Sequence, residues 1–294
     1  MFALLALPHV AYRLVLKSMD FVDIVNMSIC TTKMAGITRD NMYQLKNLDV
    51  VLDKGLGIVF RKEYDEICVF EAVGTEQRLI GAAEHVCALF RSKVHTIRIV
   101  NGSSWILDWV NNTCQGISKV VYQNKLLNYD DLTHILKNCS AEILKIRTRP
   151  QKGFQFNQKF GNFKTLLSMT GDFLTIDNLM AMSCSKIQIG MPLFKSSDVN
   201  RFLKNWMNGG SSNLEFLRIG VLMLDEEIVL TGLEDYVRRT ENKRMYTWNH
   251  TFMKCGLFPT QHEFDGLEVH RKDGTIASLL FKGSAVFGML VLKK

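Results

Sequence analysis

The stretch from Cys184 to Ile189 reads CSKIQI, and the stretch from Leu214 to Ile219 reads LEFLRI. Both place apolar residues at the first, fourth and sixth positions. The same spacing occurs three times upstream, at Val94/Ile97/Ile99, Ile117/Val120/Tyr122 and Ala141/Leu144/Ile146. The middle residues, 97, 120, 144, 187 and 217, are therefore 23, 24, 43 and 30 residues apart. A short apolar segment at a regular interval predicts one strand per repeat, and the interval of 43 is long enough to hide a degenerate copy or an insertion.

Helical patterns fill the intervals between these strands. The clearest begins at Ser196 or Ser197 and ends at Met207, and Gly209 just beyond it is typical of a left-handed C-cap. Alternation at this period favours a leucine-rich-repeat-like α/β solenoid, with a parallel sheet and helices on one side. Residues 45–72 predict a short antiparallel region, and the turn Lys272-Asp273-Gly274 predicts antiparallel strands at the end of the solenoid. An ordinary doubly wound α/β sheet is the alternative, because the asparagine usual at the corner of a leucine-rich repeat is missing.

The composition is typical of a soluble globular protein. Of the 294 residues, 47% are apolar and 22% are charged, which is enough apolar material for a large core and too much for global disorder. No apolar run approaches the roughly 18 residues that a membrane span requires. The apolar start lacks a basic region and is a poor signal peptide. The seven cysteines are irregularly spaced, so we expect reduced thiols in a cytoplasmic or nuclear protein, without a disulfide framework or zinc ribbon.

Short motifs for catalysis and cofactor binding do not occur in the sequence. It contains no GxxxxGK[ST] loop, no GxGxxG loop and no GxSxG elbow. His262-Glu263 begins an HExxH zinc motif, but Gly266 stands where the second histidine would be. We therefore expect no cofactor, no metal site and no enzymatic activity.

The excess positive charge is concentrated in one stretch. The formal net charge is +7, and residues 143–171 contain six basic and no acidic residues, which leaves 30 basic (36 − 6) and 29 acidic residues elsewhere. The six are Lys145, Arg147, Arg149, Lys152, Lys159 and Lys164, interleaved with Phe154, Phe156, Phe160 and Phe163. Such a mixture suits an acidic partner or a nucleic acid. Alternatively, the phenylalanines of an irregular loop pack inward and the basic groups are merely solvated.

The first 30 residues are unusually apolar, with 21 apolar side chains. Leu7-Pro8 opens one helical pattern, since proline suits the first turn of a helix, and Asp20 is placed to cap a second. Two short helices that are apolar nearly all round leave surface for the rest of the chain or for a partner to cover.

This N-terminal sequence resembles an F-box. Residues 4–8 read LLALP, residues 15–20 read VLKSMD and residues 23–30 read DIVNMSIC, similar to the box of a large nematode family that also carries a type-2 F-box-associated domain. Thr31-Thr32 depart from the Ser-Lys usual in that family. The resemblance implies a three-helix F-box in residues 1–45 that docks on the Skp-type adaptor of an SCF ubiquitin ligase and, through it, on a cullin. It implies adaptor contacts at Leu5, Leu7, Pro8, Val15, Leu16, Met19 and Ile24.

Residues 46–294 resemble the associated domain of the same family, most clearly in 163–179, 198–215 and 269–292. The resemblance implies a substrate-recognition subunit whose C-terminal domain binds a protein target. If the basic stretch makes this contact, the target is acidic or phosphorylated, and the contacts are Lys145, Arg147, Arg149, Lys152, Phe154, Phe156 and Lys159. We expect no membrane partner. A nucleic-acid binder that uses the same stretch and a scaffold with a vestigial F-box are the less favoured alternatives.

Overall fold

The computed structural model describes residues 7–41, 48–53, 57–62, 65–71, 76–100, 105–113, 117–123, 129–148, 153–241, 243–248 and 260–292. By its internal contacts the chain divides into two compact units, Met1–Val121 (unit 1) and Tyr122–Lys294 (unit 2). The predicted domain boundary between residues 45 and 46 lies outside the described residues and stays a prediction. In these ranges no helix has both the length and the apolar character to cross a bilayer.

Unit 1 begins with three helices, α1 (His9–Ser18), α2 (Phe21–Cys30) and α3 (Thr32–Asn41). Pro8 precedes α1 with a φ of −55°, which its ring favours, and its carbonyl accepts a hydrogen bond from the Tyr12 amide at 3.0 Å. Asp20 stands at the N-cap of α2, as predicted, although its side chain makes no capping hydrogen bond. Helices α2 and α3 pack against each other and against α4 (Glu76–Leu89), so the three N-terminal helices share a core with the rest of unit 1.

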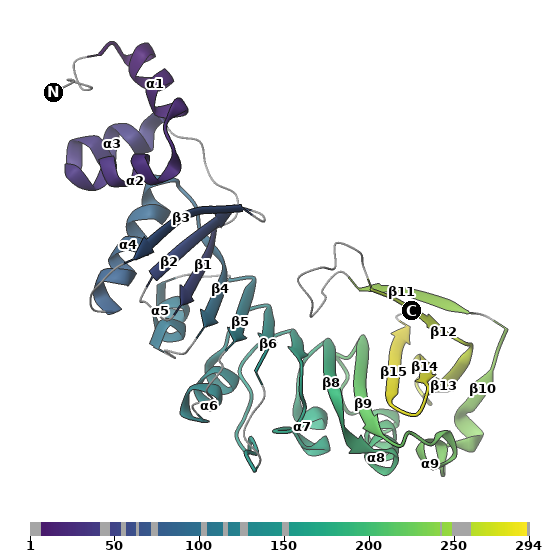
Figure 1. Cartoon of the computed structure of the whole chain (residues 1–294). Coiled ribbons are helices and arrows are strands. Elements are labelled where there is room, and N and C mark those ends of the chain that lie inside the picture. Colours follow the sequence, from purple (N-terminus) through teal and green to yellow (C-terminus); the bar gives the residue numbers. More distant parts are fainter. Residues whose placement is uncertain are drawn as a thin grey trace. The chain divides into compact units, whose positions relative to one another are not determined.

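A mixed sheet forms the rest of unit 1 (Figure 1). Strands β1 (Leu48–Asp53), β2 (Gly57–Lys62) and β3 (Asp65–Glu71) pair antiparallel, as predicted for residues 45–72. Helix α4 leads from β3 to β4 (Val94–Val100), which pairs parallel with β1. Helix α5 (Trp105–Thr113) then leads to β5 (Lys119–Gln123), and the strand order is β5-β4-β1-β2-β3. Strands β4 and β5 coincide with the first two predicted repeats.

Four parallel strands run through unit 2: β6 (Ile143–Ile146), β7 (Thr165–Ser168), β8 (Lys186–Lys195) and β9 (Phe216–Leu222). The middle residues of the repeats are in register, with Leu144 opposite Leu166, Leu166 opposite Ile187 and Ile187 opposite Leu217. All four are at most 1% exposed. The interval of 43 residues therefore hides one degenerate copy, Phe163/Leu166/Ser168, whose middle residue divides it into steps of 22 and 21.

Helices α6 (Tyr129–Asn138), α7 (Ile176–Ala181) and α8 (Ser196–Met207) lie along one face of the unit 2 sheet (Figure 1). Helix α8 has the predicted bounds. At its start the Lys195 amide donates to the Asp198 carboxylate at 2.9 Å, and Gly209 past its end has a φ of +94°. Trp206 is 1% exposed, so the apolar side of α8 faces the sheet.

An antiparallel part completes unit 2. After α9 (Glu226–Leu230) and a 3-10 turn (Glu234–Tyr236), the strands β10 (Val237–Arg239), β13 (Leu267–His270), β14 (Ile276–Lys282) and β15 (Val286–Leu292) follow. Their order is β10-β13-β14-β15-β9, so β15 joins the parallel strands at β9, and the predicted antiparallel end is confirmed.

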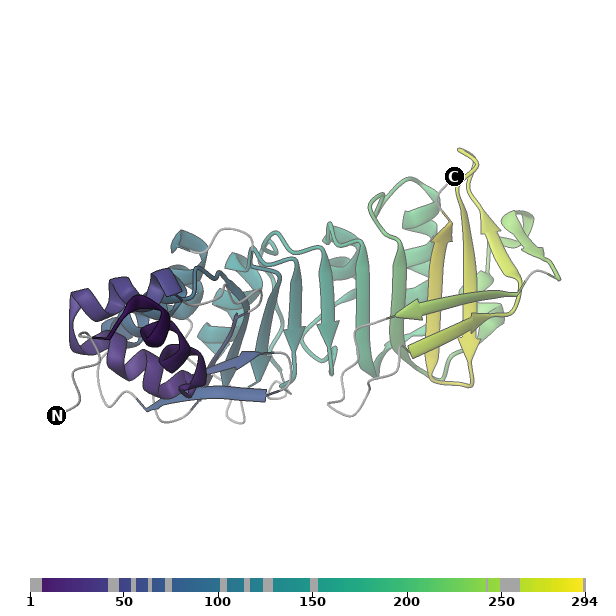
Figure 2. The ribbon, with the colours of Figure 1, turned by 90° about the horizontal axis from the view of Figure 1, so that it is seen from above.

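A separate hairpin of β11 (Arg244–Trp248) and β12 (Thr260–Phe264) lies on the face of the unit 2 sheet opposite α7 and α8 (Figure 2). It is packed on a core cluster of buried residues: Ile143, Leu167, Phe216, Phe264 and Leu280. The fold class is thus α/β, as predicted, and more exactly a mixed one in which parallel and antiparallel strands share a sheet.

Candidate functional site

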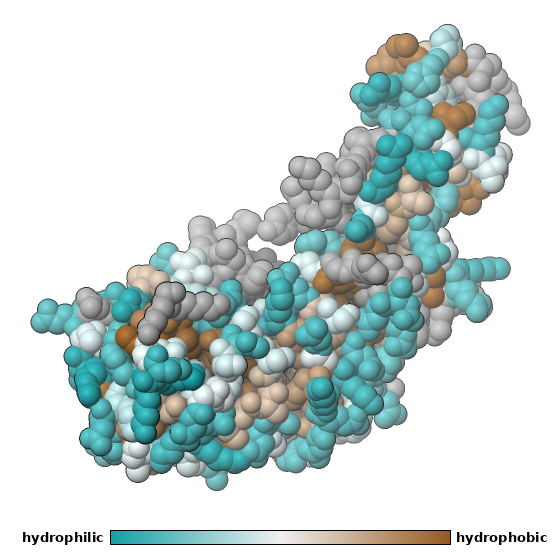
Figure 3. Space-filling view, turned by 180° about the vertical axis from the view of Figure 1, so that it is seen from behind, coloured by the Kyte–Doolittle hydropathy of each residue, from teal (hydrophilic) through white to brown (hydrophobic). Residues whose placement is uncertain are grey.

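Helices α1 and α2 carry exposed apolar side chains. Val10 and Leu14, one turn apart on α1, are 71% and 64% exposed, and Val22 and Ile29 on α2 are 38% and 58% exposed. These are four of the nine large apolar side chains that are exposed among the described residues. Figure 3 shows hydrophobic side chains among hydrophilic ones on the surface of the N-terminal helices. Such a concentration on a small helical module is typical of a protein interaction surface.

The predicted adaptor contacts differ in their exposure to solvent. Leu16 and Ile24 are 0% and 3% exposed and belong to the core of the helices. Pro8 is exposed, and Leu5 lies outside the described residues. The half-buried members are Leu7, Val15 and Met19.

The exposed residues of α1 and α2 were not among the predicted contacts. The spacing of Val10 and Leu14 by four residues places them on one face of a helix and is visible in the sequence. Because α1 is apolar on several sides, that spacing does not tell which face meets the core. Only the packing of α1 shows that Tyr12 and Leu16 face inward.

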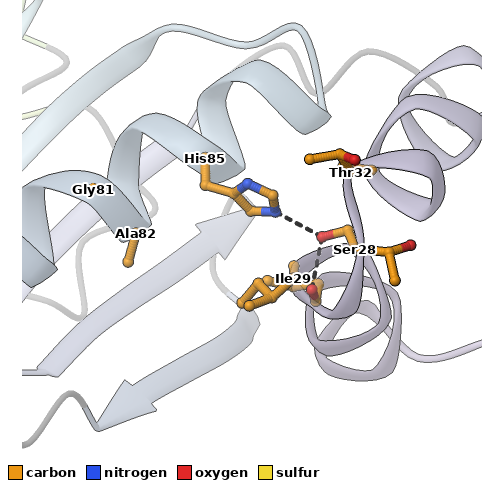
Figure 4. A pocket seen from close by; sticks show the side chains of 9 residues that line it. Ser28, Ile29, Thr32, Gly81, Ala82 and His85 are labelled. Carbon is orange, nitrogen blue, oxygen red and sulfur yellow. Dashed lines mark hydrogen bonds between the residues drawn. The ribbon is translucent and has the colours of Figure 1, made fainter.

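A hollow of about 460 Å³ lies between α2, α3 and α4 (Figure 4). Its wall is mostly apolar and includes Val25 and Ile29 of α2, Ala35 of α3 and Ala82 of α4. Gly81 on α4 adds no side chain, which widens the hollow at that helix. The hollow is therefore suited to an apolar side chain rather than to a charged ligand.

Ser28 and His85 meet in the wall of this hollow (Figure 4). The Ser28 hydroxyl donates to the Val25 carbonyl at 2.7 Å, and Ser28 Oγ lies 2.7 Å from His85 Nε2. Which of the two atoms donates depends on the tautomer of the His85 ring. Burial lowers the pKa of His85, which keeps the ring neutral at pH 7. This hydrogen bond links α2 to α4.

The basic, Phe-rich stretch is largely part of the core of unit 2. Phe156 and Phe163 are 1% and 2% exposed, and Lys145 is 4% exposed. The Phe156 and Phe160 rings lie 4.6 Å apart and the Phe160 and Phe163 rings 6.3 Å apart. These rings are packed among themselves, as the inward-packing interpretation predicts, and two of them have no free face for a nucleobase.

The other predicted target contacts differ in exposure. Lys159 is exposed, Phe154 is half-buried and stacked on Tyr129 at 5.0 Å, and Arg149 and Lys152 lie outside the described residues. Arg147 is half-buried, and its burial lowers the pKa of the guanidinium. The stretch thus presents a few basic groups at the surface above an aromatic core.

In the described part of the chain no three His, Cys, Asp or Glu side chains form a group that would hold a metal ion. Cys139 and Cys184 are buried, and burial raises the pKa of both thiols to about 12. Both are therefore protonated at pH 7 and behave as small apolar side chains.

Comparison with known proteins identifies the centre of unit 2. Residues 154–219, which include β7, α7, β8 and α8, match the model of the family described as "F-box associated". The uncharacterized proteins F59B2.9 and F59B2.8 of Caenorhabditis elegans are each 22% identical to this chain, over 95% and 96% of its length and 75% and 74% of their own. No solved structure shows a significant match. The comparisons thus support a protein that contains an F-box-associated domain and is similar to nematode proteins, as the resemblance predicted.

Proposed function

We propose that this chain is the substrate-recognition subunit of an SCF-type ubiquitin ligase, acting in the cytoplasm or nucleus. In this proposal α1–α3 are the F-box, which docks on the Skp-type adaptor and through it on a cullin. Unit 2, with its leucine-rich-repeat-like parallel strands, holds a protein target. The chain contributes proximity between target and ligase, and no catalytic residue of its own.

The observation that carries the proposal is a pair of features in one chain. Residues 154–219 match an F-box-associated family, and the N-terminal helices expose four large apolar side chains. Apolar surface removed from water contributes about 25 cal/mol per Å², so residues exposed as far as Val10 and Leu14 have most of this free energy still to gain. A helical partner surface that covers them supplies the burial that the chain itself does not.

The buried members of the predicted contact sets take a supporting role. Leu16 and Ile24 are buried in the core of the N-terminal helices, which keeps the exposed residues of α1 and α2 in their positions. Lys145 and Phe156 are buried in unit 2, while Lys159 is exposed to an acidic or phosphorylated target.

Calorimetric titration of the purified Skp-type adaptor into the full chain tests the proposal. We expect submicromolar binding by the wild type and a loss of at least tenfold in affinity for Leu14→Glu, because a charge replaces an apolar group at the interface. Ile228→Glu in α9 is the matched control, since Ile228 is 47% exposed and lies in unit 2.

Two results would count against the ligase subunit. The first is an absence of adaptor binding by a folded wild type. The second is equal affinity for wild type, Leu14→Glu and the double variant Leu7→Ala, Pro8→Ala, with unchanged thermal unfolding in all three. Either result favours a scaffold with a vestigial box.

A further inference from the structure

The helix-free face of the unit 2 sheet carries a row of residues of which all but Leu167 are polar. In each parallel strand the residue after the middle apolar position points to this face, since side chains alternate along a strand. Lys145 is opposite Leu167, Leu167 opposite Gln188, and Gln188 opposite Arg218. The hairpin β11–β12 covers the end of this row at β9, where Phe216 stacks on Tyr246 with ring centroids 4.6 Å apart.

Arg218 is a half-buried cation in this row without a counterion. Its side chain has no hydrogen bond or ion pair with any described residue, and its Nε is buried and unsatisfied. Burial lowers the pKa of the guanidinium, although not to a point where it loses its proton near pH 7. A cation that is withdrawn from water without an anionic partner is unfavourable, and a bound anion removes that penalty.

His262 of β12 faces the same place from the hairpin. Its ring centroid lies 5.6 Å from that of Phe216, the side chain is 6% exposed, and its Nε2 has no hydrogen-bond partner in the described structure. Burial, together with the positive charges of Arg218 and of Lys282 on β14, lowers the pKa of His262 to about 4. Among the described residues, the two charges that act on this ring are both positive.

A buried charge elsewhere in the sheet, on Glu268, does have a partner in the hairpin. Glu268 on β13 is 4% exposed, and its Oε1 accepts hydrogen bonds from Arg244 Nη2 at 3.1 Å and Nε at 3.3 Å. Arg244 belongs to β11, so the hairpin supplies a partner for this carboxylate. The described residues of β11 and β12 supply none for Arg218, and β12 brings a second nitrogen donor, His262, to the Phe216 side chain.

We propose that Arg218, His262 and Lys282 form an anion subsite that takes the phosphate group of a phosphorylated segment of the target. This inference rests on the proposed function of unit 2 as the target-binding part. Arg218 lies two residues from Phe216 on the same face of β9, and the His262 ring is 5.6 Å from that of Phe216. Lys282 lies two residues from Leu280, which packs in one cluster with Phe216. These three nitrogen donors have no carboxylate partner among the described residues, which fits the nearly double charge and three oxygens of a phosphate better than the single charge of Asp or Glu.

Neighbouring residues extend the subsite along the sheet. Gln188 is next to Arg218 across one strand spacing of about 4.8 Å and is 7% exposed, so its amide is placed to donate to the same anion. Lys145 lies three strands away in the same row, about 14 Å at that spacing. A phosphorylated segment that crosses the strands from Arg218 toward β6 therefore approaches the predicted basic stretch.

The test is a calorimetric titration of the full chain with a pentapeptide, acetyl-Ala-Ala-phosphoserine-Ala-Ala-amide. The comparison probes are the same peptide with serine or glutamate at the centre, and inorganic phosphate alone. We expect the phosphopeptide to bind at least tenfold more tightly than the other three. Arg218→Gln should weaken it at least tenfold and His262→Phe several-fold, whereas the controls Arg238→Gln and Lys272→Gln, both at exposed sites in unit 2, should leave it unchanged.

Several outcomes overturn the inference. The first is that the folded wild type does not bind the phosphopeptide. The second is that it binds the glutamate peptide or inorganic phosphate as tightly as the phosphopeptide. The third is that Arg218→Gln and Lys282→Gln both leave the phosphopeptide affinity unchanged. Lys282 is exposed, so its variant keeps the test valid if a change at Arg218 or His262 impairs folding. Adaptor binding is measured on the same samples. Adaptor binding without phosphopeptide binding rejects only the anion subsite. Phosphopeptide binding without adaptor binding rejects only the proposal of a ligase subunit.

Discussion

Replacing Phe156 by alanine distinguishes a core residue from a target contact. Phe156 is 1% exposed, and its ring lies 4.6 Å from that of Phe160. A buried phenylalanine removes about 150–250 Å² from water, which at about 25 cal/mol per Å² amounts to about 4–6 kcal/mol. The unfolded chain already buries part of this area, and the β-carbon remains in alanine, so we expect Phe156→Ala to lower the free energy of unfolding by about 3–5 kcal/mol.

Differential scanning calorimetry of the full chain measures this effect. For a unit of this size each kcal/mol lowers the midpoint by about 2–4 °C, so the variant should unfold roughly 10 °C lower. Lys159→Ala is the control, because Lys159 is exposed in the same stretch and its loss should change the free energy by less than about 0.5 kcal/mol. A Phe156→Ala variant that keeps its midpoint within about 2 °C but no longer binds the phosphopeptide would refute the inward packing and restore Phe156 as a contact.

Three further changes test other parts of the structure. Leu16→Ala should lower the free energy of unfolding by about 2–5 kcal/mol because Leu16 is fully buried. Leu14→Ala should lower it by less than about 0.5 kcal/mol because Leu14 is 64% exposed. Urea unfolding measures both values, and equal losses would contradict the assigned face of α1. The pKa of His262 is about 4 in the folded chain and 6.5 in the unfolded chain. The contribution of the neutral ring to the free energy of unfolding is therefore complete above pH 6.5 and is lost as the pH falls toward 4. Urea unfolding at pH 7.5 and 5 should therefore show a smaller loss for His262→Phe than for wild type, and parallel losses would reject the buried neutral ring. Gly266→Ala should lower the midpoint of thermal unfolding much more than Gly283→Ala. Both glycines have a positive φ, but only at Gly266 would a β-carbon overlap the Thr240 carbonyl. Similar midpoints for the two variants would contradict this close approach.

The strands of the repeat were predictable because their apolar residues recur at a fixed spacing. The copy at β7 escaped the pattern because Ser168 stands at its third position. In the structure Ser168 is 0% exposed, and its hydroxyl donates to the Thr170 carbonyl at 2.5 Å, so a buried polar group is satisfied locally. A pattern that counts only apolar residues does not register such a position.

The orientation of α1 and the place of the hairpin were not predictable in the same way. Both depend on contacts between residues far apart in the chain, such as Ser28 with His85 and Phe216 with Tyr246. Local periodicity tells that a helix or a strand forms, but tertiary packing decides which of two apolar faces is covered. Lys145 shows the same limit, since its charge marked it as a surface residue and its place in the sheet buries it.

The repeat also explains why the proposed subsite lies where it does. The second and third apolar positions of each copy share one face of the strand, and the residue between them faces the opposite side. That residue is Lys145 in β6, Leu167 in β7, Gln188 in β8 and Arg218 in β9. A substitution at this position changes the helix-free face of the sheet. It leaves the side chains of Leu144, Ile187 and Leu217, which point to the other face, in place. Because the hairpin adds His262 only beside β9, the subsite forms at the one end of the row where a repeat residue and a hairpin residue meet. The pattern that determines the fold thus leaves one position per strand free for recognition, and the hairpin selects which of those positions becomes a binding site.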